Sequence, residues 1–136
     1  MDNFYLKTYR LLKGLRNVSK WKNRKILYSD SIGISLRYYK EMFNYQPLFI
    51  FRKKGGVRWA FLLYNQQLIE IKQTNSGKVA NECVLYASNI YKEYFDLVRK
   101  AQIIKPLMIK GETKRKTFSV RDANGNTLEY CEAKVC

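Results

Sequence analysis

Apolar and polar residues alternate along the first half of the chain in a pattern that predicts one strand, one helix and three further strands. Residues 25–29 (KILYS) have the composition of a strand. Apolar positions then recur at spacings of four, three and four, the period of an amphipathic helix, at Ile32, Leu36, Tyr39 and Phe43. Pro47 stops that helix. Residues 48–73 predict three apolar strands, separated by the turn-forming stretches KKGG and YNQQ.

The same order of elements returns in the second half. Residues 79–87 predict a strand, residues 88–101 predict a helix capped by Ser88 or Asn89, and three more strands follow in IIKPLMI, TFSVR and TLEYCEA. The two helices also share letters, since YYKEMF at 38–43 resembles IYKEYF at 90–95. The repeated order indicates a duplication. We therefore predict an α+β fold in which two βαβββ modules, at about 22–73 and 79–136, form a cupped mixed sheet.

The segment before the modules, residues 1–21, is strongly basic. Its apolar residues recur at nearly helical spacing, at Tyr5, Tyr9, Leu12 and Leu15, and most of its lysines and arginines fall on the other side. We predict a basic N-terminal helix. Two interpretations stay open: the helix packs against the body with a solvated basic face, or that face contacts nucleic acid or a membrane surface.

Charge and composition narrow the classes of chemistry. The chain carries 26 lysines and arginines against 11 acidic residues, and the resulting net charge of +15 favours anionic partners. The absence of histidine excludes serine triads, cysteine–histidine dyads and histidine-bound zinc. The three cysteines show no CxxC spacing, which indicates neither a disulfide framework nor a thiolate zinc site. No apolar run approaches the roughly 20 residues of a membrane span, so we expect a soluble cytoplasmic protein.

The stretch RDANGNTLEY, residues 121–130, predicts a tight hairpin. The Asp, Asn and Gly residues at 122–126 tolerate left-handed backbone or hydrogen-bond their own turn. Beyond the turn, Leu128 and Tyr130 point to one face of the strand, whereas Glu129 and Cys131 point to the other. Since the apolar pair is expected to pack against a helix, Glu129 is expected on the opposite, concave face. The same alternation in LIEI separates Glu70 from its two isoleucine neighbours.

Four segments together resemble the vicinal oxygen chelate superfamily, which includes glyoxalases, extradiol dioxygenases and bleomycin resistance proteins. They are SLRYYKEMFNYQP, QQLIEIKQ, the stretch from CVLYASN to VRKA, and TFSVRDANGNTLEY. The last is the most specific, because it is similar to the family's closing hairpin, F-x-x-R-D-P-D-G-N-x-x-E. The resemblance covers residues 22–132, which is nearly all of the chain beyond the basic segment.

The resemblance implies positions for metal ligands. It places a carboxylate ligand at Glu129, a second at Glu70, and Glu82 as the nearest candidate for a ligand at the start of the fifth strand. The first-strand position falls near Asn23 or Arg24, and neither is a good ligand. The alternative is that each carboxylate is simply solvated, and this interpretation is favoured for Glu82.

Two functions follow from the resemblance. The leading one is a binding protein of the bleomycin resistance type, which sequesters an aromatic or anionic small molecule without turnover, cofactor or catalytic residue. Its expected ligand-binding residues are Phe49, Trp59, Glu70, Phe118, Glu129 and Cys131. The resemblance also implies a homodimer. For each aromatic residue the alternative is packing in the core.

The competing function is a divalent-metal-dependent lyase, isomerase or transferase. In that case Glu70, Glu82 and Glu129 would hold Mg²⁺ or Mn²⁺, ions that favour oxygen ligands. A third interpretation, nucleic-acid binding, depends on the basic segment at 1–21, where aromatic and basic residues are interleaved.

Overall fold

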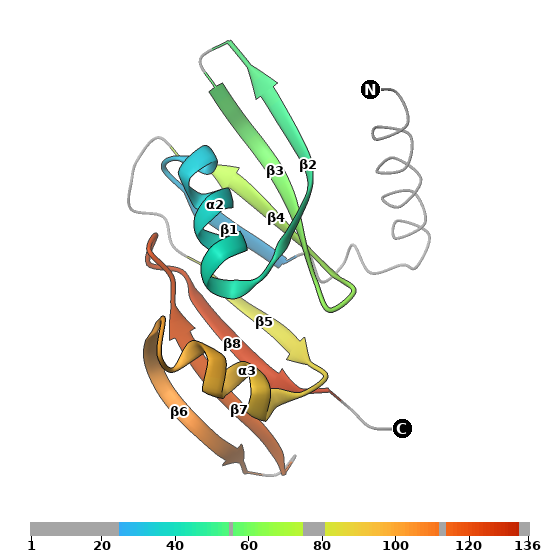
Figure 1. Ribbon diagram of the computed structural model, residues 1–136, viewed down its shortest axis with the longest axis vertical. Helices are drawn as coiled ribbons and strands as arrows, with labels where there is room; N and C mark the ends of the chain where they lie inside the picture. The colour runs from blue at the N-terminus through green and yellow to red at the C-terminus, as the bar shows by residue number, and fades with distance from the viewer. Residues whose placement is uncertain (1–24, 55, 75–80, 112–113, 134–136) are drawn as a thin grey trace.

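A computed structural model describes residues 25–54, 56–74, 81–111 and 114–133 (Figure 1). The predicted N-terminal helix at 1–21 lies outside them. The first module consists of β1 (Lys25–Ser29), α2 (Ile32–Phe43), β2 (Gln46–Lys53), β3 (Gly56–Tyr64) and β4 (Gln67–Gln73). The second consists of β5 (Glu82–Ala87), α3 (Ile90–Leu97), β6 (Gln102–Lys110), β7 (Arg115–Arg121) and β8 (Thr127–Glu132). The α+β fold and the two βαβββ modules are therefore confirmed.

The ends of the helices follow their local chemistry. The helix α2 stops at Phe43 because Asn44 adopts the left-handed conformation, with φ 59°, and the backbone then enters β2. The side chain of Asn89 caps α3 by accepting a hydrogen bond from the Lys92 backbone N–H at 3.2 Å. Neither helix, nor any other helix within the described ranges, is long and apolar enough to cross a membrane.

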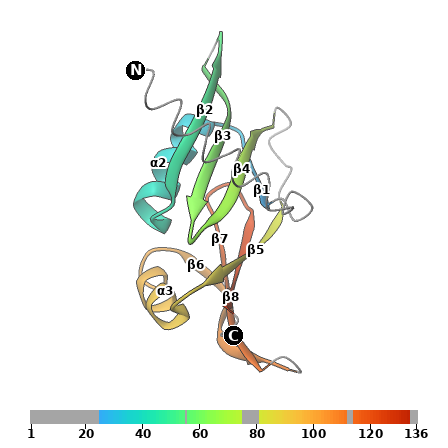
Figure 2. The ribbon, with the colours of Figure 1, turned by 90° about the vertical axis from the view of Figure 1, so that its right-hand side faces the viewer.

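Each module forms its own four-stranded mixed sheet. Sheet A has the order β1-β4-β3-β2 and sheet B has the order β5-β8-β7-β6. In both sheets the first strand pairs parallel with the last, and the remaining pairs are antiparallel. Figures 1 and 2 show α2 and α3 on the same side of their respective sheets. The two sheet faces turned away from the helices therefore lie on the other side of the molecule.

The two modules correspond residue by residue, but in a different register from the shared helix letters. Tyr28 in β1 corresponds to Tyr86 in β5, and the cap Ser31 corresponds to the cap Asn89. The letter match instead aligns Tyr39 and Phe43, which are 0% and 2% exposed, with Tyr91 and Phe95, which are 47% and 62% exposed. That alignment of the helices was wrong, because identical letters lie on opposite faces of α2 and α3.

Amide side chains join the modules where the edge strands β1 and β5 meet, and two of them each bind both the N–H and the carbonyl of one residue. The Asn126 side chain accepts a hydrogen bond from the Tyr28 N–H at 3.3 Å and donates one to the Tyr28 carbonyl at 2.9 Å. At the corresponding place, the Gln67 side chain accepts from the Tyr86 N–H at 2.8 Å and donates to the Tyr86 carbonyl at 2.7 Å. Each bridge satisfies backbone groups on a strand that lies at the edge of its described sheet.

The predicted hairpin at 121–130 forms and is tied into this junction. The Asp122 carboxylate accepts hydrogen bonds from the backbone N–H groups of Asn124 and Asn126 at 2.9 and 2.8 Å, and Gly125 has φ 87°. The Tyr39 hydroxyl of α2 donates to the same carboxylate. Because Asp122 is buried, these bonds offset the cost of removing its charge from water.

One hydrophobic cluster runs through both modules on the helix side of the sheets. The hydroxyls of Tyr45 and Tyr130 share a hydrogen bond, and the Tyr64 ring packs edge-on against the Tyr130 ring at 5.6 Å. Burial raises the pKa of both hydrogen-bonded tyrosines well above the ordinary value, so both stay neutral. The described modules therefore share a core and do not form separate hydrophobic units.

The two amide bridges predict unequal losses of stability. Asn126→Ala should lower the free energy of unfolding by about 3 kcal/mol, because Asn126 is fully buried and its removal leaves backbone groups of Tyr28 and Asn81 without a partner. Gln67→Ala removes the corresponding, exposed bridge and should cost about 1 kcal/mol. Urea unfolding followed by circular dichroism measures both. Equal losses would show that burial at the junction does not set the strength of the bridge.

The raised pKa of Glu93 predicts that the stability of the fold depends on pH. Burial raises the pKa of Glu93 above 4.5, although a hydrogen bond with Tyr64 opposes the rise. The folded state therefore binds this proton more tightly than the unfolded state, and stability falls as the pH rises from about 4.5 through the raised pKa. Relative to Glu93→Gln, the wild type should lose stability over that range in urea unfolding at a series of pH values. The exposed Glu82, changed to Gln, is the control, and an identical pH profile for the wild type and Glu93→Gln would contradict the prediction.

Candidate functional site

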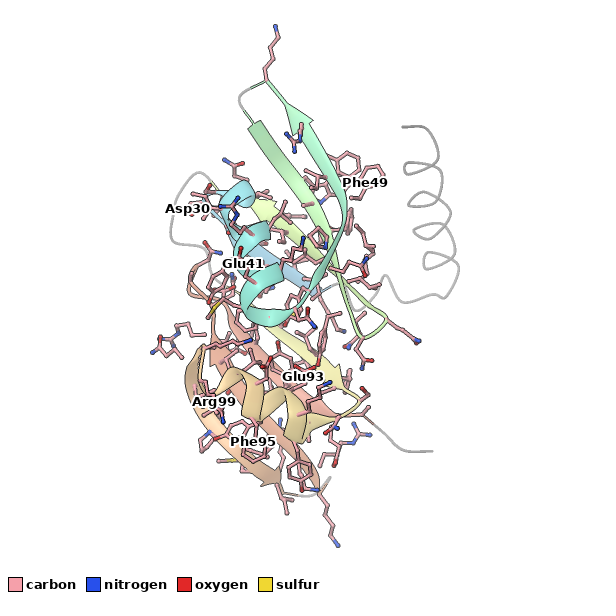
Figure 3. All side chains as sticks on the ribbon, in the orientation of Figure 1. Asp30, Glu41, Phe49, Glu93, Phe95 and Arg99 are labelled. Carbon is pink, nitrogen blue, oxygen red and sulfur yellow. The ribbon has the colours of Figure 1, made fainter. Side chains whose placement is uncertain are left out.

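The face of sheet A turned away from α2 carries a row of aromatic rings, which we call the aromatic face. It comprises Phe49 and Phe51 on β2 and Trp59 and Phe61 on β3. Successive ring centroids lie 4.3 Å apart from Phe49 to Phe51, 4.3 Å from Phe51 to Trp59 and 5.0 Å from Trp59 to Phe61. Figure 3 shows Phe49 on the opposite side of β2 from α2. The row follows from alternation, because each strand places every second residue on this face.

A carboxylate lies at one end of the aromatic row. Glu70 on β4 pairs with Phe61 in the β3–β4 ladder and is only 3% exposed. The Lys72 ammonium, two residues further along the same strand, lies 3.5 Å from the Glu70 carboxylate. The pairing of these charges reduces the cost of burying Glu70.

The indole nitrogen of Trp59 is a second polar group in the row. Its Nε1 is buried and has no hydrogen-bond partner among the residues that the structure describes. A buried N–H donor without an acceptor is costly, so most are paired in folded proteins. Trp59 therefore presents a donor toward which a ligand acceptor could be directed.

The corresponding face of sheet B is less aromatic and more polar. Glu129 on β8 lies between Val84 on β5 and Ser119 on β7 in the strand pairing. Its side chain is 33% exposed and lies 3.3 Å from the Lys110 ammonium. Glu129 and Glu70 occupy corresponding positions in the two modules, each beside a lysine, but only Glu70 is buried among aromatic rings.

Most of the predicted ligand-binding residues lie on the two faces turned away from the helices. Phe49, Trp59 and Glu70 gather on sheet A, whereas Glu129 and Cys131 lie on sheet B. Phe118 belongs to neither face. It is 1% exposed, stacks on the Tyr130 ring at 4.8 Å and packs against Tyr94 of α3. The expectation that Phe118 lines a site is corrected, because its position in the alternation of β7 turns it toward the helix.

The three carboxylates named as metal ligands do not form one site. Glu70 lies on sheet A, and Glu82 and Glu129 lie on sheet B, where they pair with different partners, Thr127 and Val84. Within the described ranges, no group of three or more His, Cys, Asp or Glu side chains is arranged to hold a metal ion. The residues therefore do not fit the three-carboxylate site that the resemblance implied.

The two described cysteines are not arranged as nucleophiles. Burial raises the pKa of the Cys83 thiol to about 12, and Cys83 packs in the core. Burial, and then the charge of Glu129, raise the pKa of Cys131 as well. Neither thiol is shifted toward the thiolate that nucleophilic chemistry requires.

Sequence reasoning missed the lysines that accompany the carboxylates. Lys72 could have been found, because a residue two positions from Glu70 on a strand lies on the same face. Lys110 had no local signal, since its contact with Glu129 joins β6 to β8 across the sheet.

The fold is that of several solved structures, although their sequence identity to this chain is low. No family model and no curated protein sequence matches the chain. A member of the glyoxalase/bleomycin resistance protein/dioxygenase superfamily from Sphaerobacter thermophilus DSM 20745 is 14% identical, with a TM-score of 0.67 over 82% of this chain and 95% of that one.

Two further structures carry functional names. The bleomycin-binding protein of bleomycin-producing Streptomyces verticillus, complexed with copper(II)-bleomycin, is 11% identical, with a TM-score of 0.63 over 81% of this chain and 93% of that one. A lactoylglutathione lyase from Agrobacterium tumefaciens is 14% identical, with a TM-score of 0.61 over 81% and 91%. The duplicated modules and these matches agree with the resemblance carried by the closing hairpin, and the chain has the fold of the glyoxalase/bleomycin resistance protein/dioxygenase superfamily.

Proposed function

We propose that the protein binds a planar aromatic small molecule on the aromatic face of sheet A and does not transform it. The observation that carries the proposal is the row of four rings from Phe49 to Phe61, each 4.3–5.0 Å from the next. Such a surface offers flat apolar contact, and binding sites for aromatic ligands combine this contact with a few polar groups.

The polar groups beside the rings suggest the character of the ligand. The indole N–H of Trp59 can donate to a ligand acceptor, and the paired charges of Glu70 and Lys72 can orient a group that both donates and accepts. Since this pair is neutral overall and the chain carries +15, a neutral or anionic ligand is favoured over a cation. The bleomycin-binding protein of Streptomyces verticillus, whose structure holds copper(II)-bleomycin, supports small-molecule binding on this fold.

The proposal assigns no catalytic residue. The lactoylglutathione lyase of Agrobacterium tumefaciens shares the fold, so metal-dependent catalysis is the competing function. Against it stand the separated carboxylates of the described residues and the absence of histidine from the chain.

Ligand binding on the aromatic face predicts a signal from one indole. Titration with 2-naphthoate, a planar aromatic anion, should shift the Trp59 indole N–H resonance in a nitrogen–proton correlation spectrum. The other tryptophan resonance is identified with Trp21→Phe. Phe51→Ala should weaken binding roughly tenfold, because it removes a ring from the middle of the row.

The matched control is Phe95→Ala, which removes an exposed aromatic ring from α3, on the other side of the molecule. It should leave the affinity unchanged. Equal weakening by Phe51→Ala and Phe95→Ala, or a titration that leaves the Trp59 signal in place, would reject the aromatic face as the site.

The competing function is tested by calorimetric titration with Mn²⁺ and with Mg²⁺. The wild type, Glu129→Ala and Glu82→Ala should give the same heats, because Glu129 is paired with Lys110 and belongs to no group of three or more potential metal ligands within the described ranges. Saturable binding that Glu129→Ala abolishes and Glu82→Ala preserves would favour the metal-dependent enzyme over the binding protein.

A further inference from the structure

The outer surface of α3 carries an apolar stripe that the core does not use. Tyr91, Phe95 and Val98 are 47%, 62% and 42% exposed, and they follow one another at spacings of four and three, which places them on one side of the helix. Figure 3 shows Phe95 and Glu93 on different sides of α3. Ile90 and Leu97, which are buried, supply the contact with sheet B.

The duplication provides an internal comparison for this stripe. With Ser31 and Asn89 as corresponding caps, the positions of Tyr91, Phe95 and Val98 are occupied in α2 by Gly33, Arg37 and Lys40. All three residues of α2 are exposed. A helix of this module therefore packs on its sheet with small or charged residues at these positions, and the apolar residues of α3 are not a requirement of the fold.

Basic side chains surround the stripe. The Lys116 ammonium lies 4.9 Å from the centroid of the Tyr91 ring. Lys92 on α3 and Arg99, just beyond the end of α3, are exposed neighbours. Asp96, the exposed acid of the helix, is paired with Lys100 at 3.3 Å, and Lys116 is paired with Glu132 at 3.7 Å. The unbalanced positive charge therefore comes from Lys92 and Arg99. The surface thus combines apolar and aromatic side chains with an excess of positive charge.

We propose that this side of α3 docks on an anionic lipid surface. Exposed apolar residues beside lysines and arginines are the features with which interfacial helices bind acidic membranes. Aliphatic Val98 gains contact from acyl chains, whereas the phosphates and bases of a nucleic acid would leave it without an apolar partner.

A second copy of the chain fits this surface less well. The stripe offers roughly 300 Å² of apolar surface, whereas a stable dimer buries roughly 800 Å² on each partner. Two copies, each carrying +15, would also bring like charges together around the stripe. An anionic surface has the opposite charge and does not require a large matching area.

Docking through α3 is compatible with ligand binding. Both helices lie on the side of the molecule opposite the faces that carry Phe49, Trp59 and Glu129 (Figure 2). A chain held to a membrane by α3 would therefore keep the aromatic face turned away from the lipid, and the two proposals can be tested separately.

The test uses cosedimentation of the full chain with phosphatidylcholine vesicles, with and without phosphatidylserine. The wild type should bind only the vesicles that contain phosphatidylserine. The double variant Phe95→Arg, Val98→Lys carries the residues that α2 has at these positions, and it should bind roughly tenfold more weakly although it adds two positive charges. Attraction by charge alone predicts the reverse order and would overturn the proposal.

The charge-neutral variant Phe95→Ser, Val98→Ser should also lose binding. Ile34→Ser, which removes an exposed apolar side chain from α2, should keep it. Circular dichroism checks that each variant is folded, as expected for exposed positions. The lipid proposal fails if Phe95→Ser, Val98→Ser leaves vesicle binding unchanged. If that variant then abolishes binding to a fluorescent oligothymidine, the stripe binds nucleic acid; if it dissociates a dimer in sedimentation velocity, the stripe binds a second copy of the chain.

Discussion

The hydrogen bonding of two strand edges at the centre of the molecule holds the two modules in their arrangement. Strands β1 and β5 are edge strands of separate sheets, and their backbone groups at Tyr28 and Tyr86 find partners in side chains of the other module. Asn126 and Gln67 supply those partners with one amide each. Because a primary amide both donates and accepts, it imitates the missing neighbouring strand.

This junction determines which surfaces are buried and which are available. Once the edges are joined, the helix sides of both sheets share one core, and residues such as Tyr130 become structural. The opposite faces of the two sheets do not pack against the helices. Sheet A uses its face for a row of aromatic rings beside Glu70, whereas sheet B uses its face for Glu129 and polar side chains. The two modules therefore present corresponding faces with different side chains, and only the face of sheet A carries the row of four rings on which ligand binding is proposed.

The helices diverged in the same way. Tyr91 and Phe95 of α3 stand where α2 has Gly33 and Arg37, although both helices bury equivalent apolar residues against their sheets. A residue on the outer side of a helix contributes little to packing, so such positions can change without loss of the fold. Both proposed binding surfaces therefore lie at positions that the core does not constrain.

The sequence by itself determined the two βαβββ modules, the closing hairpin and the side of the strand on which Glu129 lies. These features depend on periodicity and turn chemistry, which act over a few residues. It did not determine the register of the two helices or which face of β7, and so whether Phe118, packs against α3. Those features were decided by the pairing of strands and the joining of modules, which bring together residues far apart in the chain. Local patterns carry no record of such contacts, so only the tertiary structure could show them.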